Sequence, residues 1–114
     1  MSGITTHVLD TSRGRPAGGV VVRLERETAA GEWQHVGEAI TDADGRAGDL
    51  LPDDSILSEG VHRLTFATGP YFAAQEIESF YRDVVIVFSV SDPAQHYHVP
   101  LLLSPFGYST YRGS

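Results

Sequence analysis

The side chains best suited to chemistry include a pair of histidines near the C-terminal end of the chain. His96 and His98 are two residues apart, and on a β-strand this spacing places both imidazoles on the same face. The pair could simply lie on a solvent-facing sheet, or it could form half of a zinc site. A zinc site needs a third ligand, and no His-x-x-x-His or aspartate-rich partner lies nearby in the sequence.

The other histidines are more scattered. His7 falls in a strand-like segment, on the face it shares with Thr5 and Leu9. A single histidine among apolar neighbours is usually a structural residue, and this is the first interpretation of His7. His35 and His62 have no suggestive neighbours, so both are expected at the surface.

Arg46 directly follows an Asp-Ala-Asp-Gly turn. Its guanidinium could pair with Asp42 or Asp44, which is the simplest expectation for an arginine in a turn. Alternatively, the planar guanidinium could bind a carbonyl or anionic oxygen of a substrate.

The C-terminal segment is unusual because it stays rich in strand-forming residues almost to its end, whereas terminal residues are normally polar and frayed. A strand held this close to the end could deliver Ser114 and its carboxylate to a defined place. The simpler interpretation is an edge strand.

The elements that must position these residues are short strands separated by turns rich in glycine, proline and aspartate. Thr41–Arg46 is expected to form a tight turn, and Pro70–Phe80 is the only stretch with helical composition. Asp83–Val90 is expected to be a strand buried on both faces. The other expected strands are Ile4–Leu9, Val20–Glu27, Trp33–Ile40, Gly60–Thr68, His96–Ser104 and Tyr108–Arg112.

This pattern predicts an all-β, two-sheet sandwich of about eight strands with one short helix, in a single domain spanning residues 1–114. Many unrelated functions share such an architecture. The sequence pattern of the strands therefore predicts the fold without predicting the activity.

The amino-acid composition excludes several classes of binding partner. The formal net charge is -7, the eight basic residues are all arginine, and there is no cysteine. An acidic domain repels nucleic acid and anionic membranes, and the apolar runs are far shorter than the roughly 20 residues that span a bilayer. Disulfides and thiolate metal sites are excluded. With no signal-peptide pattern at the N-terminus, a cytoplasmic protein is expected.

Five segments carry a resemblance that runs through the chain in a constant order. They are Thr5–Thr11, Gly14–Ala17, Asp44–Arg46, His98–Pro105 and the terminal Tyr111–Ser114. Together they resemble the 5-hydroxyisourate hydrolase family, the enzymatic relatives of transthyretin. The terminal Tyr-Arg-Gly-Ser is the most specific segment, because it distinguishes the enzymes from the hormone carriers.

The resemblance implies a transthyretin-like sandwich that forms a homotetramer, a dimer of dimers with catalytic pockets between the dimers. It also implies that no metal or cofactor takes part. The position of His96 varies in the family, and Phe80–Asp83 lacks the proline that the family is expected to place after its aromatic pair. The implied catalytic residues are His7, Arg46, His98 and Ser114; the implied substrate-binding residues are His7, Arg46, Tyr111, Arg112, Gly113 and Ser114.

The implied reaction opens a cyclic amide of 5-hydroxyisourate with water during urate degradation, giving 2-oxo-4-hydroxy-4-carboxy-5-ureidoimidazoline. An imidazole exchanges protons near neutral pH, so His7 and His98 would form the acid/base pair, with His98 activating water. Arg46 would stabilise the developing negative charge, and Ser114 would position water or substrate.

The main alternative is a non-catalytic, transthyretin-like protein that binds a small ligand. A histidine-based metalloprotein and a structural domain of a larger assembly are the other candidates. Metal analysis of the purified protein would distinguish a metalloprotein from the other candidates.

Overall fold

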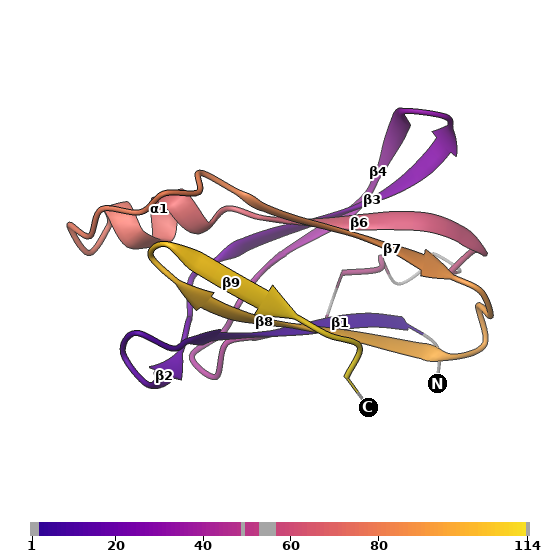
Figure 1. Ribbon diagram of the computed structural model, residues 1–114. Coiled ribbons are helices and arrows are strands. Elements are labelled where there is room, and N and C mark those ends of the chain that lie inside the picture. Colours follow the sequence, from indigo (N-terminus) through magenta and orange to yellow (C-terminus); the bar gives the residue numbers. More distant parts are fainter. Residues whose placement is uncertain (1–2, 49, 53–56, 114) are drawn as a thin grey trace.

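The computed structural model describes residues 3–48, 50–52 and 57–113, and it shows two β-sheets packed face to face with a short helix at one end (Figure 1). The first sheet has the order β2-β1-β8-β9, with β5 also paired to β1. The second sheet has the order β4-β3-β6-β7. The predicted all-β sandwich with one helix is confirmed. The elements are β1 (Gly3–Asp10), β2 (Arg15–Pro16), β3 (Val21–Ala29), β4 (Glu32–Ile40), β5 (Arg46–Ala47), β6 (Gly60–Phe66), α1 (Thr68–Ala73), β7 (Val84–Val90), β8 (His96–Ser104) and β9 (Gly107–Thr110).

Opposite ends of the chain meet in the first sheet. β1 and β8 pair in parallel, which sets Thr5 opposite His98. β5 pairs antiparallel with β1 and sets Arg46 opposite His7. Three segments that are distant in the sequence therefore contribute to one short stretch of sheet.

Side-chain alternation divides this sheet into a core face and an outward face. In β1 the even-numbered residues are buried, whereas Thr5 and His7 lie on the outward face. β8 buries Tyr97 in the same way and leaves His96 exposed and His98 half-buried. The core between the sheets is built from Ile4, Val8, Ala17, Val20, Val22, Leu24, Leu50, Leu57, Leu64, Phe66, Phe72, Val84, Val90, Tyr97, Val99, Leu101 and Leu103.

The tight turn predicted at Thr41–Arg46 is confirmed. Gly45 donates its backbone N–H to the carbonyl of Asp42 at 2.8 Å and has a φ of 78°, a conformation that glycine adopts without strain. The carbonyl of Gly45 also accepts the N–H of Val8 at 2.7 Å. The turn therefore locks β5 onto β1.

The short helix expected within Pro70–Phe80 forms, but it begins earlier than predicted, since α1 spans Thr68–Ala73. The helix cannot run on through Glu76, because that residue has a φ of 59°, in the left-handed region. Phe72 is buried and attaches the helix to the core.

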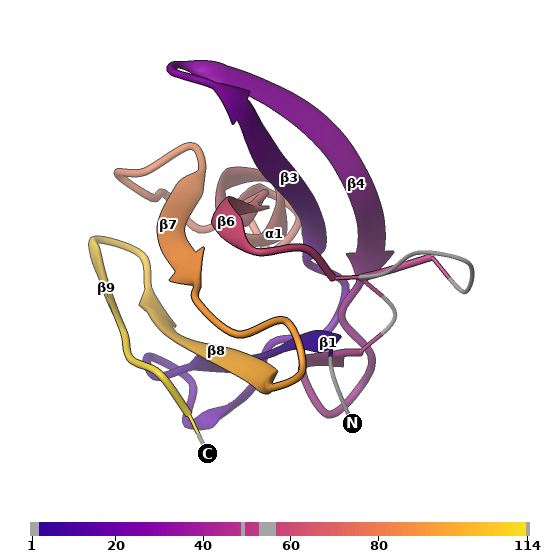
Figure 2. The same cartoon turned by 90° about the vertical axis from the view of Figure 1, so that its right-hand side faces the viewer.

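The expectation that Asp83–Val90 is buried on both faces is wrong. β7 is the edge strand of the second sheet, and Val85 and Val87 are 46% and 57% exposed. A continuous apolar run is typical of a strand covered on both faces, but a strand in a two-layer sandwich is covered on only one. Figure 2 shows this strand on the same side of the sandwich as β9.

No helix among the described residues is long and apolar enough to cross a membrane.

Candidate functional site

The polar residues selected from the sequence converge on the outward face of the first sheet. His7 comes from β1, Arg46 from β5 and His98 from β8, and the strand register makes these segments neighbours. A cavity of about 310 Å³ opens here, and we refer to it as the sheet-face pocket. It is lined by Thr5, Thr6, Arg46, Ala47, Gly48, His96 and His98.

His98 is half-buried and is held by one ring nitrogen. Its Nδ1 lies 2.8 Å from Oγ1 of Thr5. Burial lowers the pKa of His98, and electrostatic repulsion from the nearby His96, His7 and Arg46 side chains acts in the same direction, while a hydrogen bond to the backbone of Thr5 opposes them. The imidazole is therefore neutral near pH 7 and able to accept a proton.

His7 is anchored to the turn that precedes β5. Its Nε2 donates a hydrogen bond to the backbone carbonyl of Asp44 at 2.8 Å. A neutral ring that donates from Nε2 carries its lone pair on Nδ1. His7 thus has a defined orientation instead of being a free surface side chain.

The guanidinium of Arg46 makes no ion pair or hydrogen bond within the described part of the chain. The carboxylate of Asp42 instead accepts backbone N–H groups, that of Asp44 at 2.9 Å and that of Arg46 at 3.0 Å. The pairing of Arg46 with a turn aspartate, the simplest expectation from the sequence, does not form here. The guanidinium lines the sheet-face pocket and is available to a ligand.

The C-terminal segment packs directly on His98. Gly113 donates its N–H to the carbonyl of His98 at 2.8 Å. A Cβ at position 113 would lie 2.5 Å from Cδ2 of the imidazole, so only glycine permits this approach. Ser114 lies outside the described residues.

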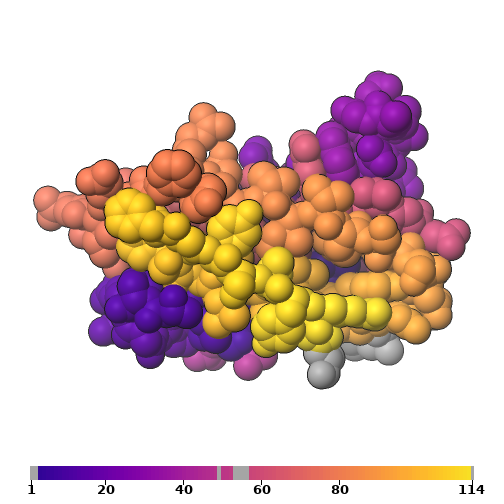
Figure 3. All heavy atoms as spheres, in the orientation of Figure 1, coloured from indigo at the N-terminus to yellow at the C-terminus, as the bar shows by residue number. Residues whose placement is uncertain are grey.

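Tyr111 and Arg112 line a different cavity from Arg46, although His98 is part of both. Both line a second cavity of about 160 Å³, which has His98 in its wall as well. The guanidinium of Arg112 lies 4.6 Å above the ring of Tyr97 and donates to Oε1 of Gln95 at 3.0 Å. In Figure 3 the yellow C-terminal residues run along the surface beside the orange residues of β7.

Two further features concern the histidine pair. His96 and His98 share the outward face, as their spacing predicted, and Thr5 lies between them. Sequence reasoning missed the contact of Thr5, because the parallel pairing of β1 with β8 has no local signal. No set of three or more histidine, aspartate or glutamate residues in the described ranges could hold a metal ion.

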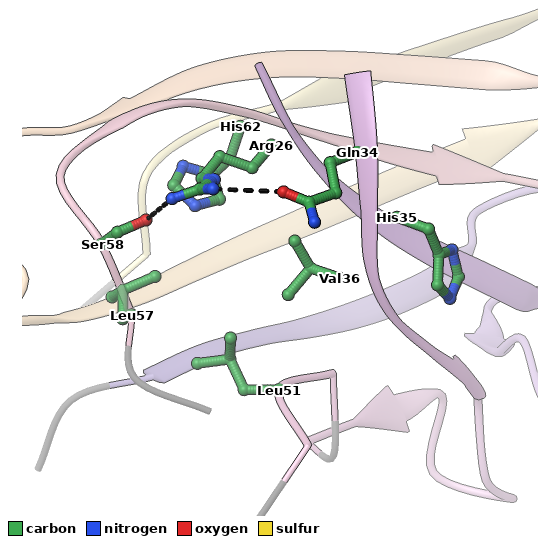
Figure 4. A pocket seen from close by; sticks show the side chains of 8 residues that line it. All are labelled: Arg26, Gln34, His35, Val36, Leu51, Leu57, Ser58 and His62. Atoms are coloured by element: carbon green, nitrogen blue, oxygen red, sulfur yellow. Dashed lines mark hydrogen bonds between the residues drawn. The ribbon is translucent and has the colours of Figure 1, made fainter. Parts of the chain in front are cut away.

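A further cavity lined by histidines, of about 250 Å³, lies beside the β3–β4 hairpin, and we refer to it as the hairpin pocket (Figure 4). The guanidinium of Arg26 donates to Oγ of Ser58 at 2.9 Å and to Oε1 of Gln34 at 3.1 Å. These bonds hold the arginine in place. The pocket is lined by Arg26, Gln34, His35, Val36, Leu51, Leu57, Ser58 and His62.

The expectation that His62 lies at the surface is wrong, although His35 is exposed as expected. His62 is only 1% exposed, stacks on Phe88 with ring centroids 6.0 Å apart, and donates from Nδ1 to the carbonyl of Gly60 at 3.1 Å. Burial lowers the pKa of His62. Its position in β6 turns it toward the core, which an isolated histidine in a sequence does not reveal.

The fold and the sheet-face pocket together define a class of protein. It is a transthyretin-like β-sandwich with histidines and an arginine on the outward face of one sheet. The family model described as the HIUase/Transthyretin family matches residues 4–113. The chain belongs to this family.

Individual relatives show the same similarity over all or nearly all of their length. The chain is 49% identical over 118 residues to the 5-hydroxyisourate hydrolase of Caulobacter vibrioides, with 100% of both chains covered. The structure of Klebsiella pneumoniae 5-hydroxyisourate hydrolase matches with a TM-score of 0.85 and 38% identity, covering 100% of this chain and 94% of that one. Transthyretin from Sparus aurata matches with a TM-score of 0.90 and 32% identity, covering 99% and 97%. Because the enzyme and transthyretin share the fold, the site residues must distinguish them.

Proposed function

We propose that this chain hydrolyses 5-hydroxyisourate to 2-oxo-4-hydroxy-4-carboxy-5-ureidoimidazoline, a step of urate degradation. The observation that carries the proposal is that Arg46 and His98 line one pocket, while His7 lies on the same sheet face and opposite Arg46 in the strand register. The 49% identity to a 5-hydroxyisourate hydrolase supplies the substrate.

His98 acts as the general base. Its lowered pKa leaves the imidazole neutral, so it takes a proton from water as the water oxygen bonds to the ring carbonyl carbon. The C–N bond of the cyclic amide then breaks, and the departing nitrogen receives a proton from the histidine pair. His7, held by the carbonyl of Asp44, is the second acid/base group.

Arg46 stabilises the oxyanion that forms when water adds to the carbonyl. Support comes from its guanidinium, which has no protein partner within the described residues and lines the pocket. Ser114 follows Gly113, which is bonded to the backbone of His98, and would position water or substrate from there. Tyr111, Arg112 and Gly113 would complete the substrate-binding wall.

The assembly is a homotetramer, a dimer of dimers. Support comes from exposed apolar side chains on β7 and β9, where Val85, Val87 and Tyr108 are 46%, 57% and 42% exposed. Unpaired strand edges of this kind tend to be covered by pairing with another copy. Light scattering at micromolar concentration should give a tetramer, and a fully active monomer would contradict a catalytic pocket between dimers.

A cysteine-free chain also suits a reducing cytoplasm, where we place the protein.

The decisive experiment generates 5-hydroxyisourate with urate oxidase and follows the decay of its ultraviolet absorbance. Substrate also hydrolyses spontaneously, so only acceleration in proportion to protein concentration supports the proposal. The alternative, a non-catalytic ligand carrier, is favoured by the TM-score of 0.90 to a transthyretin. A carrier would bind the substrate or an analogue without changing the decay.

A further inference from the structure

The hydroxyl of Thr5 connects the two histidines of β8. Its Oγ1 lies 2.8 Å from Nε2 of His96 and 2.8 Å from Nδ1 of His98. The proposed mechanism uses His98 and gives no role to Thr5 or His96. These contacts form a continuous series of hydrogen-bonded side chains from the exposed His96 through Thr5 to the half-buried His98.

A threonine hydroxyl has one proton, so it can donate to only one of these two rings. If Nδ1–H of His98 donates to Thr5, the lone pair of the neutral ring lies on Nε2, which forms no hydrogen bond within the described residues. If Thr5 donates to Nδ1 instead, Nε2 carries the proton and cannot accept another. The direction of one hydrogen bond therefore decides whether His98 can act as a base at Nε2.

His96 favours one of these directions. A neutral His96 with its lone pair on Nε2 accepts the proton of Thr5, which leaves the oxygen of Thr5 to accept from Nδ1–H of His98. A protonated His96 must donate at Nε2, which releases the proton of Thr5 toward His98. We infer that Thr5 is a positioning residue that, with His96 as its acceptor, holds His98 in the tautomer with a free lone pair on Nε2.

The surroundings of His98 are consistent with this arrangement. The charged or titratable groups that face it are His96 on its own strand, His7 on β1 and Arg46 on β5, and each disfavours a positive charge on His98. A neutral ring is thus the resting state, and for a neutral ring the tautomer decides reactivity. Nε2 is the ring nitrogen of His96 that faces Thr5.

The inference rests on the proposed function for its kinetic consequence. Thr5→Val keeps the branched shape and removes the hydroxyl. We expect kcat to fall roughly 10–100-fold, the range found when a group that orients a metal-bound histidine is removed, with KM little changed. Thr5→Ser should recover most of the rate, and Thr28→Val, which removes an exposed hydroxyl on the hairpin, should match the parent.

His96 gives an independent variant. His96→Gln retains an acceptor and should keep most of the rate, whereas His96→Phe should lose part of it and flatten the acid limb of the pH–kcat profile. The loss should stay well below that of His98→Ala. Full activity of folded Thr5→Val, or equal losses for the Ser and Val variants, would overturn the positioning role.

A spectroscopic measurement separates this inference from the proposed function. Nitrogen-15 NMR of the ligand-free protein at neutral pH should show His98 protonated on Nδ1, and Thr5→Val should shift the ring toward the Nε2–H form. An Nε2–H ring in the parent protein would refute the inference whether or not the protein accelerates substrate decay. If the NMR result holds but the parent protein has no activity, only the proposed function fails.

Discussion

The sheet-face pocket and the hairpin pocket contain the same types of side chain but differ in what those side chains are free to do. Each is lined by two histidines and one arginine, and their volumes are similar, about 310 and 250 Å³. In the hairpin pocket Arg26 is held by Ser58 and Gln34. In the sheet-face pocket Arg46 has no such partner among the described residues. A free guanidinium, not the presence of one, distinguishes a candidate binding site.

The histidines make the same point. Burial lowers the pKa of both His98 and His62. His62, however, is packed against Phe88 and almost completely enclosed, whereas His98 is half-buried in the wall of an open pocket. A lowered pKa marks a candidate site only where the ring can reach a substrate.

The comparison predicts its largest effect at His98. His98→Ala should reduce kcat by roughly 10²–10⁴-fold, the usual contribution of a positioned acid or base. His62→Ala should instead destabilise the fold by about 1–3 kcal/mol and leave the rate of the folded fraction near that of the parent. Steady-state kinetics combined with thermal melts tests both. Equal kinetic losses at the two positions would erase the distinction between the pockets.

The two arginines form the next pair. Arg46→Gln should lower kcat by roughly 10²–10³-fold, the effect of removing one group that stabilises an oxyanion. Arg26→Gln should leave kcat unchanged, because its guanidinium bonds only to the protein. Should both variants retain full activity, another group must stabilise the oxyanion.

The C-terminal segment contacts His98 through Gly113, whereas none of its described residues lines the hairpin pocket. Deleting Tyr111–Ser114 should lower activity about 100-fold, since small displacements of catalytic groups have effects of this size. The core is untouched, so the fold and the tetramer should persist with a modest drop in Tm. A C-terminal tag should impair activity, while an N-terminal tag serves as the control. A folded, fully active truncation would reduce the segment to an edge strand.

A smaller effect concerns pH. Because the folded-state pKa of His62 is lowered, its contribution to stability is complete above the ordinary histidine pKa of about 6.5 and is lost as pH falls through the folded-state value. His62→Gln, which does not titrate, should therefore lose fewer degrees of Tm between pH 7.5 and 5 than the parent. His35→Gln is the matched control at an exposed position. Parallel Tm curves for the parent and His62→Gln would contradict this reading.

The smallest expected effect is that of metal removal. Because His7 and His98 are assigned to proton transfer, exhaustive chelation should leave the hydrolysis rate unchanged, and elemental analysis should find no stoichiometric metal. Activity that disappears with chelator and returns with zinc would overturn the acid/base assignment.

Local patterns predicted the strands well because alternation and turn chemistry act between near neighbours. The turn at Thr41–Arg46 follows from its aspartates and Gly45, and its geometry fixes β5. The helix bounds could not be predicted, because α1 ends at Ala73 and the chain then enters the left-handed region at Glu76, a residue type that gives no such signal. The exposed face of β7 follows from the two-layer architecture, in which no third layer covers the outer face of its sheet.

The sequence by itself determined the sandwich class, the shared face of His96 and His98, and the family resemblance that singled out His7 and Arg46. Only the tertiary structure decided that β1 lies parallel to β8, that Arg46 is without an aspartate partner in the described chain, and that His62 is buried. The physical reason is the sequence separation between the residues that interact. Periodicity and turn propensities are properties of adjacent residues, whereas the contact of Thr5 with His98 depends on which strands pair.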